Sequence, residues 1–145
     1  MTDRELINRW RGNQRYTLRI IEAMPEESFD FKPIEGAKSF RSQASHITTW
    51  LRTNFRHISG HELNKAPTAN KREILQALGE LFDQVLDYLS EDPQHDLEET
   101  VKMWYGKCSK AGLLATMDNH LSHHRGQMVI YLRLEGVQPP SYVGW

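Results

Sequence analysis

Two histidines one helical turn apart, His120 and His124, are the side chains in this sequence that are best placed to bind a metal ion. They lie in a run of periodic apolar residues, from about Ser109 to Glu135, that predicts a helix. At about 100° per residue, positions four residues apart are separated by about 40° around the helix axis. Their imidazoles can therefore reach one ion, and the same spacing recurs in helical zinc sites.

The apolar stripe of this helix indicates which histidines face the core. It consists of Leu113, Met117, Leu121, Met128 and Leu132. Measured from Met117, His124 lies at about −20°, His120 at about −60° and His123 at about −120°. His120 and His124 are thus predicted to face inward, where a polar ring needs a partner and a metal can supply one. The alternative is a helix that merely carries several histidines, some of them on its surface.

Gln127 lies on the same side of the helix as His120, about one turn beyond His124. Its amide is a candidate for binding at the site, where it could orient a ligand or a water molecule. The competing interpretation is that Gln127 only hydrogen-bonds to a neighbouring helix. His123 is predicted to be dispensable because it lies about 60° further from the apolar stripe than His120. His95 is predicted to be dispensable because it lies in a polar loop.

A third ligand has to come from another element. His46 and His57 lie in a second predicted helix, about 40–59, and periodicity does not choose between them. Each, taken alone, is more often a structural or surface histidine than a ligand. His57 and His61 form a second pair with a spacing of four residues, but Gly60 between them is typical of a helix end. That pair is therefore a minor alternative.

Four helices are predicted to position these residues, at about 2–24, 40–59, 71–90 and 109–135. Each begins at a side chain that can cap it, namely Thr2, Ser39, Asn70 and Ser109. The excursion 91–107 contains alternating residues at Val101, Met103 and Tyr105, which predict a short extended piece. The aromatic residues of the tail, 137–145, indicate that it folds back onto the bundle.

Composition narrows the class of protein. With 145 residues the chain is predicted to be a single domain, 1–145. The 18 Lys and Arg and the 19 Asp and Glu leave a net charge of −1, so there is no basic excess for nucleic acid. No apolar run is long enough to span a membrane, and the start has no apolar signal region. The single cysteine, Cys108, excludes an internal disulfide and fits a cytoplasmic protein.

Three stretches of the sequence together carry a family likeness. The motif HxxxHRGQ spans His120 to Gln127, and the ending MVIYLRLEGVQPP follows it. His46 follows a Ser-Phe start of the second predicted helix, and Trp10 lies in a first helix rich in Asn and Arg. With these features the chain resembles the DinB/YfiT-like family of proposed metalloenzymes over most of its length.

This resemblance implies an all-α fold, a four-helix bundle with up-down-down-up connectivity and a long connection between helices two and three. It also implies a divalent metal, nickel or zinc, held by His46, His120 and His124. The resemblance thereby selects His46 over His57, which periodicity leaves open. Some relatives are thiol S-transferases or thiol-dependent isomerases that use bacillithiol, mycothiol or glutathione.

Three neutral imidazoles leave positions open on a divalent ion, as in a catalytic site and not a closed structural one. Such an ion can lower the pKa of bound water to about 7 or hold a thiol as its thiolate. The sequence therefore favours a metal-dependent transferase or hydrolase that acts on a small-molecule substrate and can use a low-molecular-weight thiol. We expect a pocket walled by Trp10, Trp50 and Trp104. The alternatives are a non-catalytic metal-binding stress-response protein and a bundle with purely structural histidines.

A homodimer is also predicted. Large aromatic residues lie outside the apolar stripes, in the excursion and the tail: Trp104, Tyr105, Tyr142 and Trp145. Such clusters usually mark an interface or a ligand site. The resemblance points the same way, since relatives often pair through bundle faces in two-fold dimers. The competing explanation is that these residues cover the open end of the bundle and shield the metal site.

Overall fold

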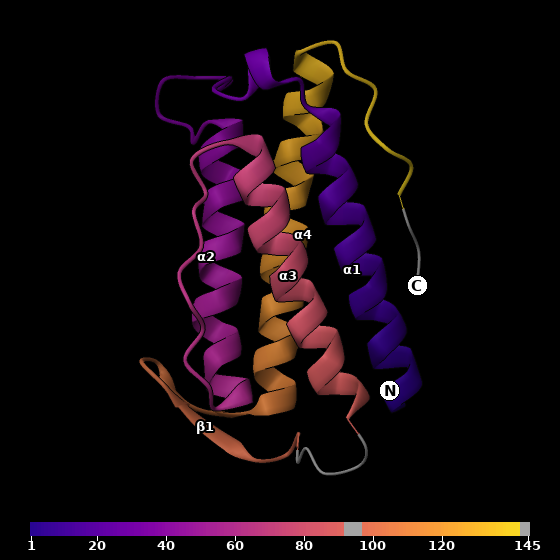
Figure 1. Ribbon diagram of the computed structural model, residues 1–145, viewed down its shortest axis with the longest axis vertical. Coiled ribbons are helices and arrows are strands. Elements are labelled where there is room, and N and C mark those ends of the chain that lie inside the picture. The colour runs from indigo at the N-terminus through magenta and orange to yellow at the C-terminus, as the bar shows by residue number, and fades with distance from the viewer. Residues whose placement is uncertain (92–96, 143–145) are drawn as a thin grey trace.

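The computed structural model describes residues 1–91 and 97–142, and in this part of the chain four α-helices pack side by side (Figure 1). The helices are α1 Asp3–Ala23, α2 Phe40–Ser59, α3 Lys71–Ser90 and α4 Lys110–Leu134. A short 3-10 helix, η1 Glu26–Ser28, follows α1, and two antiparallel strands, β1 Thr100–Met103 and β2 Gly106–Ser109, precede α4. The four predicted helices are confirmed, whereas the two-stranded sheet corrects the all-α class.

The helix starts follow from the predicted capping residues. Each helix begins after a side chain that accepts a hydrogen bond from a backbone N–H of the first turn: Thr2, Ser39, Asn70 and Ser109. At α1 the bond is reciprocal, because the Glu5 carboxylate accepts from the Thr2 N–H at 2.6 Å. A cap of this kind typically stabilises a helix by about 1 kcal/mol. At the end of α2, Gly60 has a φ of 74°, a left-handed conformation that glycine adopts without strain.

The order of the helices places α2 beside α4. In Figure 1, α1 rises from the N-terminus, α2 and α3 both begin at the opposite end, and α4 returns from the end where the hairpin lies. The connection 60–70 runs back along the bundle to the start of α3. α1 and α2 each pack against both α3 and α4. The helix that carries His46 therefore contacts the helix that carries His120 and His124.

Large apolar side chains fill the space between the four helices. Trp10, Phe40, Leu51, Phe82 and Leu121 are all buried in one cluster. Burial of a side chain of this size contributes roughly 1.5–3 kcal/mol, so the cluster holds the helices in a fixed arrangement. In the described residues, no helix is both long and apolar enough to cross a membrane.

The hairpin lies across one end of the bundle and leads directly into α4 (Figure 1). Its antiparallel register places Val101 opposite Cys108, which confirms the predicted extended piece. Met103 is buried and Val101 packs against the core, so these two side chains attach the hairpin to the helices. The turn between the strands leaves Trp104 and Tyr105 exposed.

The tail after α4 turns back along α1, as its aromatic residues predict (Figure 1). The reversal begins at Gly136, whose φ of 71° lies in the left-handed region. The ring of Tyr142 meets that of Tyr16 on α1 edge to face, with centroids 5.4 Å apart. Trp145, which also entered the prediction of a homodimer, lies outside the described residues.

Candidate metal centre

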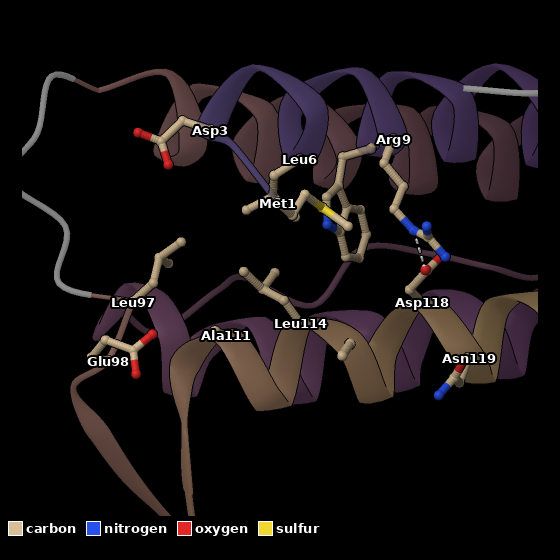
Figure 2. Close-up of a pocket in the computed structure, with 12 residues that line it drawn as sticks. Met1, Asp3, Leu6, Arg9, Leu97, Glu98, Ala111, Leu114, Asp118 and Asn119 are labelled. Carbon is tan, nitrogen blue, oxygen red and sulfur yellow. Dashed lines mark hydrogen bonds and ion pairs between the residues drawn. The ribbon is translucent and has the colours of Figure 1, made fainter.

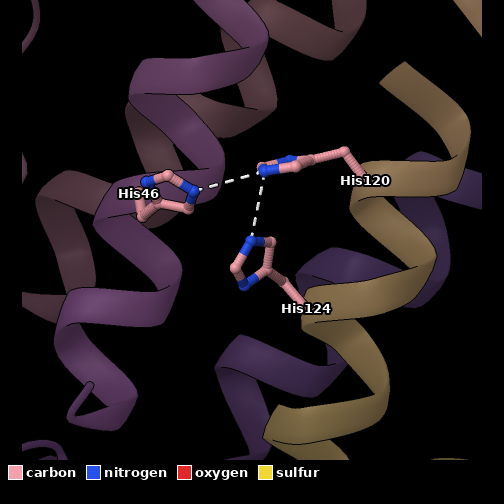
Figure 3. A group of neighbouring side chains, drawn as sticks. All are labelled: His46, His120 and His124. Atoms are coloured by element: carbon pink, nitrogen blue, oxygen red, sulfur yellow. Dashed lines mark hydrogen bonds between the residues drawn. The ribbon is translucent and has the colours of Figure 1, made fainter. Parts of the chain in front are cut away.

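The imidazole rings of His46, His120 and His124 meet between α2 and α4 (Figure 3). The His120 Nε2 atom lies 3.3 Å from His46 Nε2 and 3.2 Å from His124 Nε2. Two nitrogen ligands at about 2.0–2.1 Å from a tetrahedral ion are about 3.3 Å apart. The spacing and the chemistry of these nitrogens therefore fit one divalent ion, and the cluster could bind a metal.

Gln43 holds His124 in the tautomer that a metal ligand requires. The His124 Nδ1 atom lies 2.5 Å from Gln43 Oε1, which can only accept a hydrogen bond. Nδ1 therefore carries the proton, and the lone pair of Nε2 faces the other two rings. The Gln43 amide nitrogen in turn donates to Gln127 Oε1 at 2.6 Å. Gln43 is buried on α2 about one turn before His46, so the packing of α2 on α4 creates this bond.

Trp50 orients the ring of His120. The two rings are stacked, with centroids 3.8 Å apart and an angle of 16° between their planes. Trp50 lies one turn after His46 on α2, so the same face of α2 supplies both side chains. His120 Nδ1 is buried and has no hydrogen-bond partner among the described residues. Stacking, and not hydrogen bonding at Nδ1, therefore sets the orientation of this ring.

The three rings are neutral at pH 7. Desolvation, together with the neighbouring histidines, lowers the pKa of His120 and His124 to about 4. The pKa of His46 is also lowered, by desolvation and by the positive charge of Lys38. An imidazole must be neutral to bind a metal. Protons therefore compete little for these nitrogens at neutral pH.

We expect the metal-free protein to lose stability when the pH falls from about 7 to about 5. The pKa of His120 and His124 falls from 6.5 to about 4 on folding. Between these values the unfolded chain binds more protons, so a falling pH favours unfolding. Since solvent partly screens the rings, we expect a loss on the order of 1 kcal/mol for each. Urea unfolding at both pH values measures it, and equal pH dependence in a His120→Asn/His124→Asn variant would contradict it.

Among the residues that the structure describes, the other histidines considered from the sequence do not join this cluster. His123 is exposed, in agreement with its position further from the apolar stripe, and its Nε2 lies 3.3 Å from the Gln127 amide nitrogen. Of the described residues, His57 lies near the far end of α2 and His61 follows the end of that helix. His95 lies outside the described residues. The histidine of α2 that meets the pair on α4 is thus the one that the family resemblance selects.

Gln127 is connected to the three-histidine cluster through Gln43. Its Oε1 accepts the hydrogen bond from Gln43, which in turn binds His124. The Tyr131 hydroxyl lies 3.5 Å from the Gln43 amide nitrogen and donates to the carbonyl of Lys38 at 2.8 Å. Gln127 therefore bonds to a neighbouring helix, and the residue to which it bonds orients a candidate ligand. Gln127 thus hydrogen-bonds to a neighbouring helix, and it also belongs to the chain of hydrogen bonds that orients His124.

Replacing Gln43 with alanine should lower metal affinity by about 10–100-fold, the usual effect of losing a partner that orients a ligand. Gln127→Ala should have a smaller effect, because Gln127 acts through Gln43. A matched control is Gln14→Ala, since Gln14 bonds Asp83 and does not touch the cluster. Competition with a chromophoric chelator measures the affinities. Equal affinities in Gln43→Ala and Gln14→Ala would show that Gln43 has no role in binding.

A cavity of about 700 Å³ lies beside the cluster, between α2, the hairpin and α4. We call it the hairpin cavity, and its walls include His46, Trp50, Trp104 and Thr116. Two of the three predicted tryptophans therefore line a pocket at the site. The prediction is wrong for Trp10, which is 1% exposed in the core and does not line this cavity, because its side chain packs against α3.

A second polar cluster joins α1 to α4. The Asp118 carboxylate pairs with Arg9 Nε at 2.5 Å and accepts from the Asn13 amide at 2.9 Å. Arg125 donates to Asn13 Oδ1 at 2.8 Å and to Thr17 Oγ1 at 3.3 Å. Figure 2 shows the pair of Arg9 and Asp118 at the wall of a separate cavity of about 500 Å³. The residues that line this second cavity do not include the three histidines.

Sequence reasoning does not identify Gln43 or this second cluster. The spacing of polar residues in the sequence nevertheless gives a signal for both. Gln43 lies three residues before His46, and Asp118 and Arg125 are seven residues apart, so each pair shares one helix face. Polar residues on the inward face of a helix need partners, but the sequence does not say which helix supplies them.

The fold and the three-histidine cluster define a helical bundle with a candidate metal centre. The sequence matches the DinB family over residues 1–144, so the chain belongs to that family. The uncharacterized protein YjoA of Bacillus subtilis (strain 168) is 25% identical over 141 residues, which cover 91% of this chain and 90% of that protein.

Solved structures show the same fold. A DinB-like protein of Bacillus subtilis, YjoA, has a TM-score of 0.79 at 17% identity, and the match covers 97% of this chain and 99% of that one. A DinB-like protein of Bacillus cereus has a TM-score of 0.81 at 20% identity, with 92% and 93% covered. At these identities the likeness establishes the fold alone.

Proposed function

We propose that this protein binds one divalent metal ion, nickel or zinc, through His46, His120 and His124. We further propose that it is a metal-dependent enzyme of the thiol S-transferase or hydrolase type, acting on a small-molecule substrate. The observation that carries the proposal is the meeting of three neutral imidazole nitrogens beside a cavity. Membership of the DinB family supports it, because the resemblance noted in the sequence implies a metal held at these three positions.

The residues of this chain have separate tasks in the proposed site. Gln43 holds the His124 tautomer and Trp50 orients the His120 ring. Three protein ligands leave coordination positions free, and the hairpin cavity gives a substrate room beside His46. When bound there, a divalent ion supplies Lewis-acid activation of a thiol or of water.

The test is a metal analysis of protein purified without added metal, followed by a screen for thiol conjugation to electrophiles. About one nickel or zinc ion per chain and metal-dependent conjugation or hydrolysis would support the full proposal. Bound metal without turnover would support the alternative of a non-catalytic metal-binding protein. Failure to bind any divalent metal, with the fold intact by circular dichroism, would overturn both.

We also propose that the protein forms a homodimer. Ile130 and Leu134, one turn apart on α4, are exposed apolar side chains, and Tyr142 near them in sequence is exposed as well. Exposed apolar clusters of this kind usually mark an interface. Sedimentation velocity in the micromolar range should give the mass of two chains. An Ile130→Lys/Leu134→Lys variant should shift the protein to the monomer, and a wild-type monomer at every concentration would reject the dimer.

A further inference from the structure

The hairpin cavity is long enough to hold an extended ligand. His46 lines it at one part of α2, and Arg56 and His57 line it at another. Arg56 lies ten positions after His46 on the helix, which corresponds to about 15 Å along the helix axis. The cavity volume of about 700 Å³ lies within the range of small-molecule sites. One ligand can therefore reach His46, a member of the three-histidine cluster, and the region of Arg56 at the same time.

The end of the cavity away from the histidines carries positive charge. Arg56 on α2 and Lys102 on β1 both line it, and none of the described residues that line it is Asp or Glu. Arg56 pairs with Glu62 at 3.9 Å, but the Glu62 side chain is 90% exposed, and such surface pairs contribute little. A cavity lined by one sign of charge attracts ligands of the opposite sign.

A second observation on the hairpin points to the same kind of ligand. The strand register places Lys102 directly opposite Lys107. Like charges at directly opposite positions destabilise a pair of strands. An anion bound beside Lys102 would offset this repulsion.

Aromatic rings also line the cavity. Trp50 stacks on His120, and Trp104 and Tyr105 line the cavity from the hairpin turn. Trp104 is 93% exposed as a residue, so its ring presents apolar surface that a ligand can cover. The aromatic part of the cavity wall therefore fits an apolar or planar group.

We infer that the hairpin cavity binds an elongated anionic organic substrate. Its anionic oxygens lie at Arg56 and Lys102, its apolar part lies against Trp50 and Trp104, and its reacting end lies at His46 in the three-histidine cluster. This inference rests on the proposed function, since it names the class of substrate that the proposed enzyme takes. Either a carboxylate or a phosphate group can supply the anionic oxygens that bind to Arg56 and Lys102.

The experiment compares three probes with the same phenylpropyl body: 4-phenylbutyrate, 3-phenylpropyl phosphate and the neutral 4-phenylbutanamide. Their binding to metal-free protein at low salt is followed by tryptophan fluorescence. We expect at least one of the anionic probes to bind about tenfold or more tightly than the amide. This preference should shrink as salt is added. The tighter of the two anions identifies which group the site prefers.

The variant Arg56→Gln/Lys102→Gln should lose the preference for the anion. Arg52→Gln is a matched control, because Arg52 lies on the same helix but does not line the cavity. Equal binding of the amide and both anions, or a preference that survives in the double variant, would overturn the inference. Because the probes are tested without metal, a wild type that prefers the anion but binds no metal rejects the proposed function alone.

Discussion

Replacing His46 and His120 together with alanine should abolish tight metal binding. We expect the affinity to fall by at least about a hundredfold, because loss of even an outer partner of a ligand typically costs 10–100-fold. The physical reason is the convergence of three Nε2 atoms, of which the double variant keeps only that of His124. The measurement is a competition titration of nickel and zinc against a chromophoric chelator. Circular dichroism checks that the variant is folded.

Two single variants serve as controls for this result. His123→Ala should keep wild-type affinity, because His123 is exposed and is not one of the three histidines whose ring nitrogens meet. His57→Ala should do the same, because His57 lies outside the cluster. Full metal occupancy in the double variant would show that the assignment of the ligands is wrong. Loss of metal in His123→Ala, with the fold intact, would instead place the site on another face of α4.

Replacing Asp118 with alanine should lower the free energy of unfolding by about 3–5 kcal/mol, the usual cost of breaking a buried charge network. Asp118 is buried and binds both Arg9 and Asn13. Its carboxylate also opposes the effect of burial on Arg125, which is 3% exposed and whose pKa desolvation lowers. Without Asp118, the interior near the Arg125 charge loses a compensating negative charge.

Urea unfolding of the metal-free protein measures this effect. Asp83→Ala is the matched control, because Asp83 also joins α1 to another helix, through a bond from Gln14 at 2.7 Å, but at the exposed surface. We expect that variant to lose about 1 kcal/mol or less. Asp118→Asn should fall between the two, since its amide oxygen can still accept from Asn13. Equal losses in Asp118→Ala and Asp83→Ala would show that the network contributes no more than a surface bond.

Local signals in the sequence were sufficient for the helices and for part of the site. A capping side chain needs only its own first turn, so Thr2, Ser39, Asn70 and Ser109 could be read from the sequence. Likewise, the spacing of His120 and His124 within one helix determines that their rings lie together, because helix geometry fixes positions four residues apart. The apolar stripe correctly separated these two from His123.

Only the tertiary structure decided which side chains meet across helices. Periodicity could not choose between His46 and His57, because the choice depends on where along α4 the helix α2 packs. The family resemblance supplied that answer, and the contact between α2 and α4 gives its physical basis. The same contact brings Gln43 to His124, a bond between residues 81 positions apart in the chain. The sequence by itself thus determined the helices and the pair of His120 and His124 on α4. The packing of the helices decided that His46 is the third histidine, which tautomer His124 adopts and where the cavity lies. These features depend on distances between helices, which no local pattern encodes.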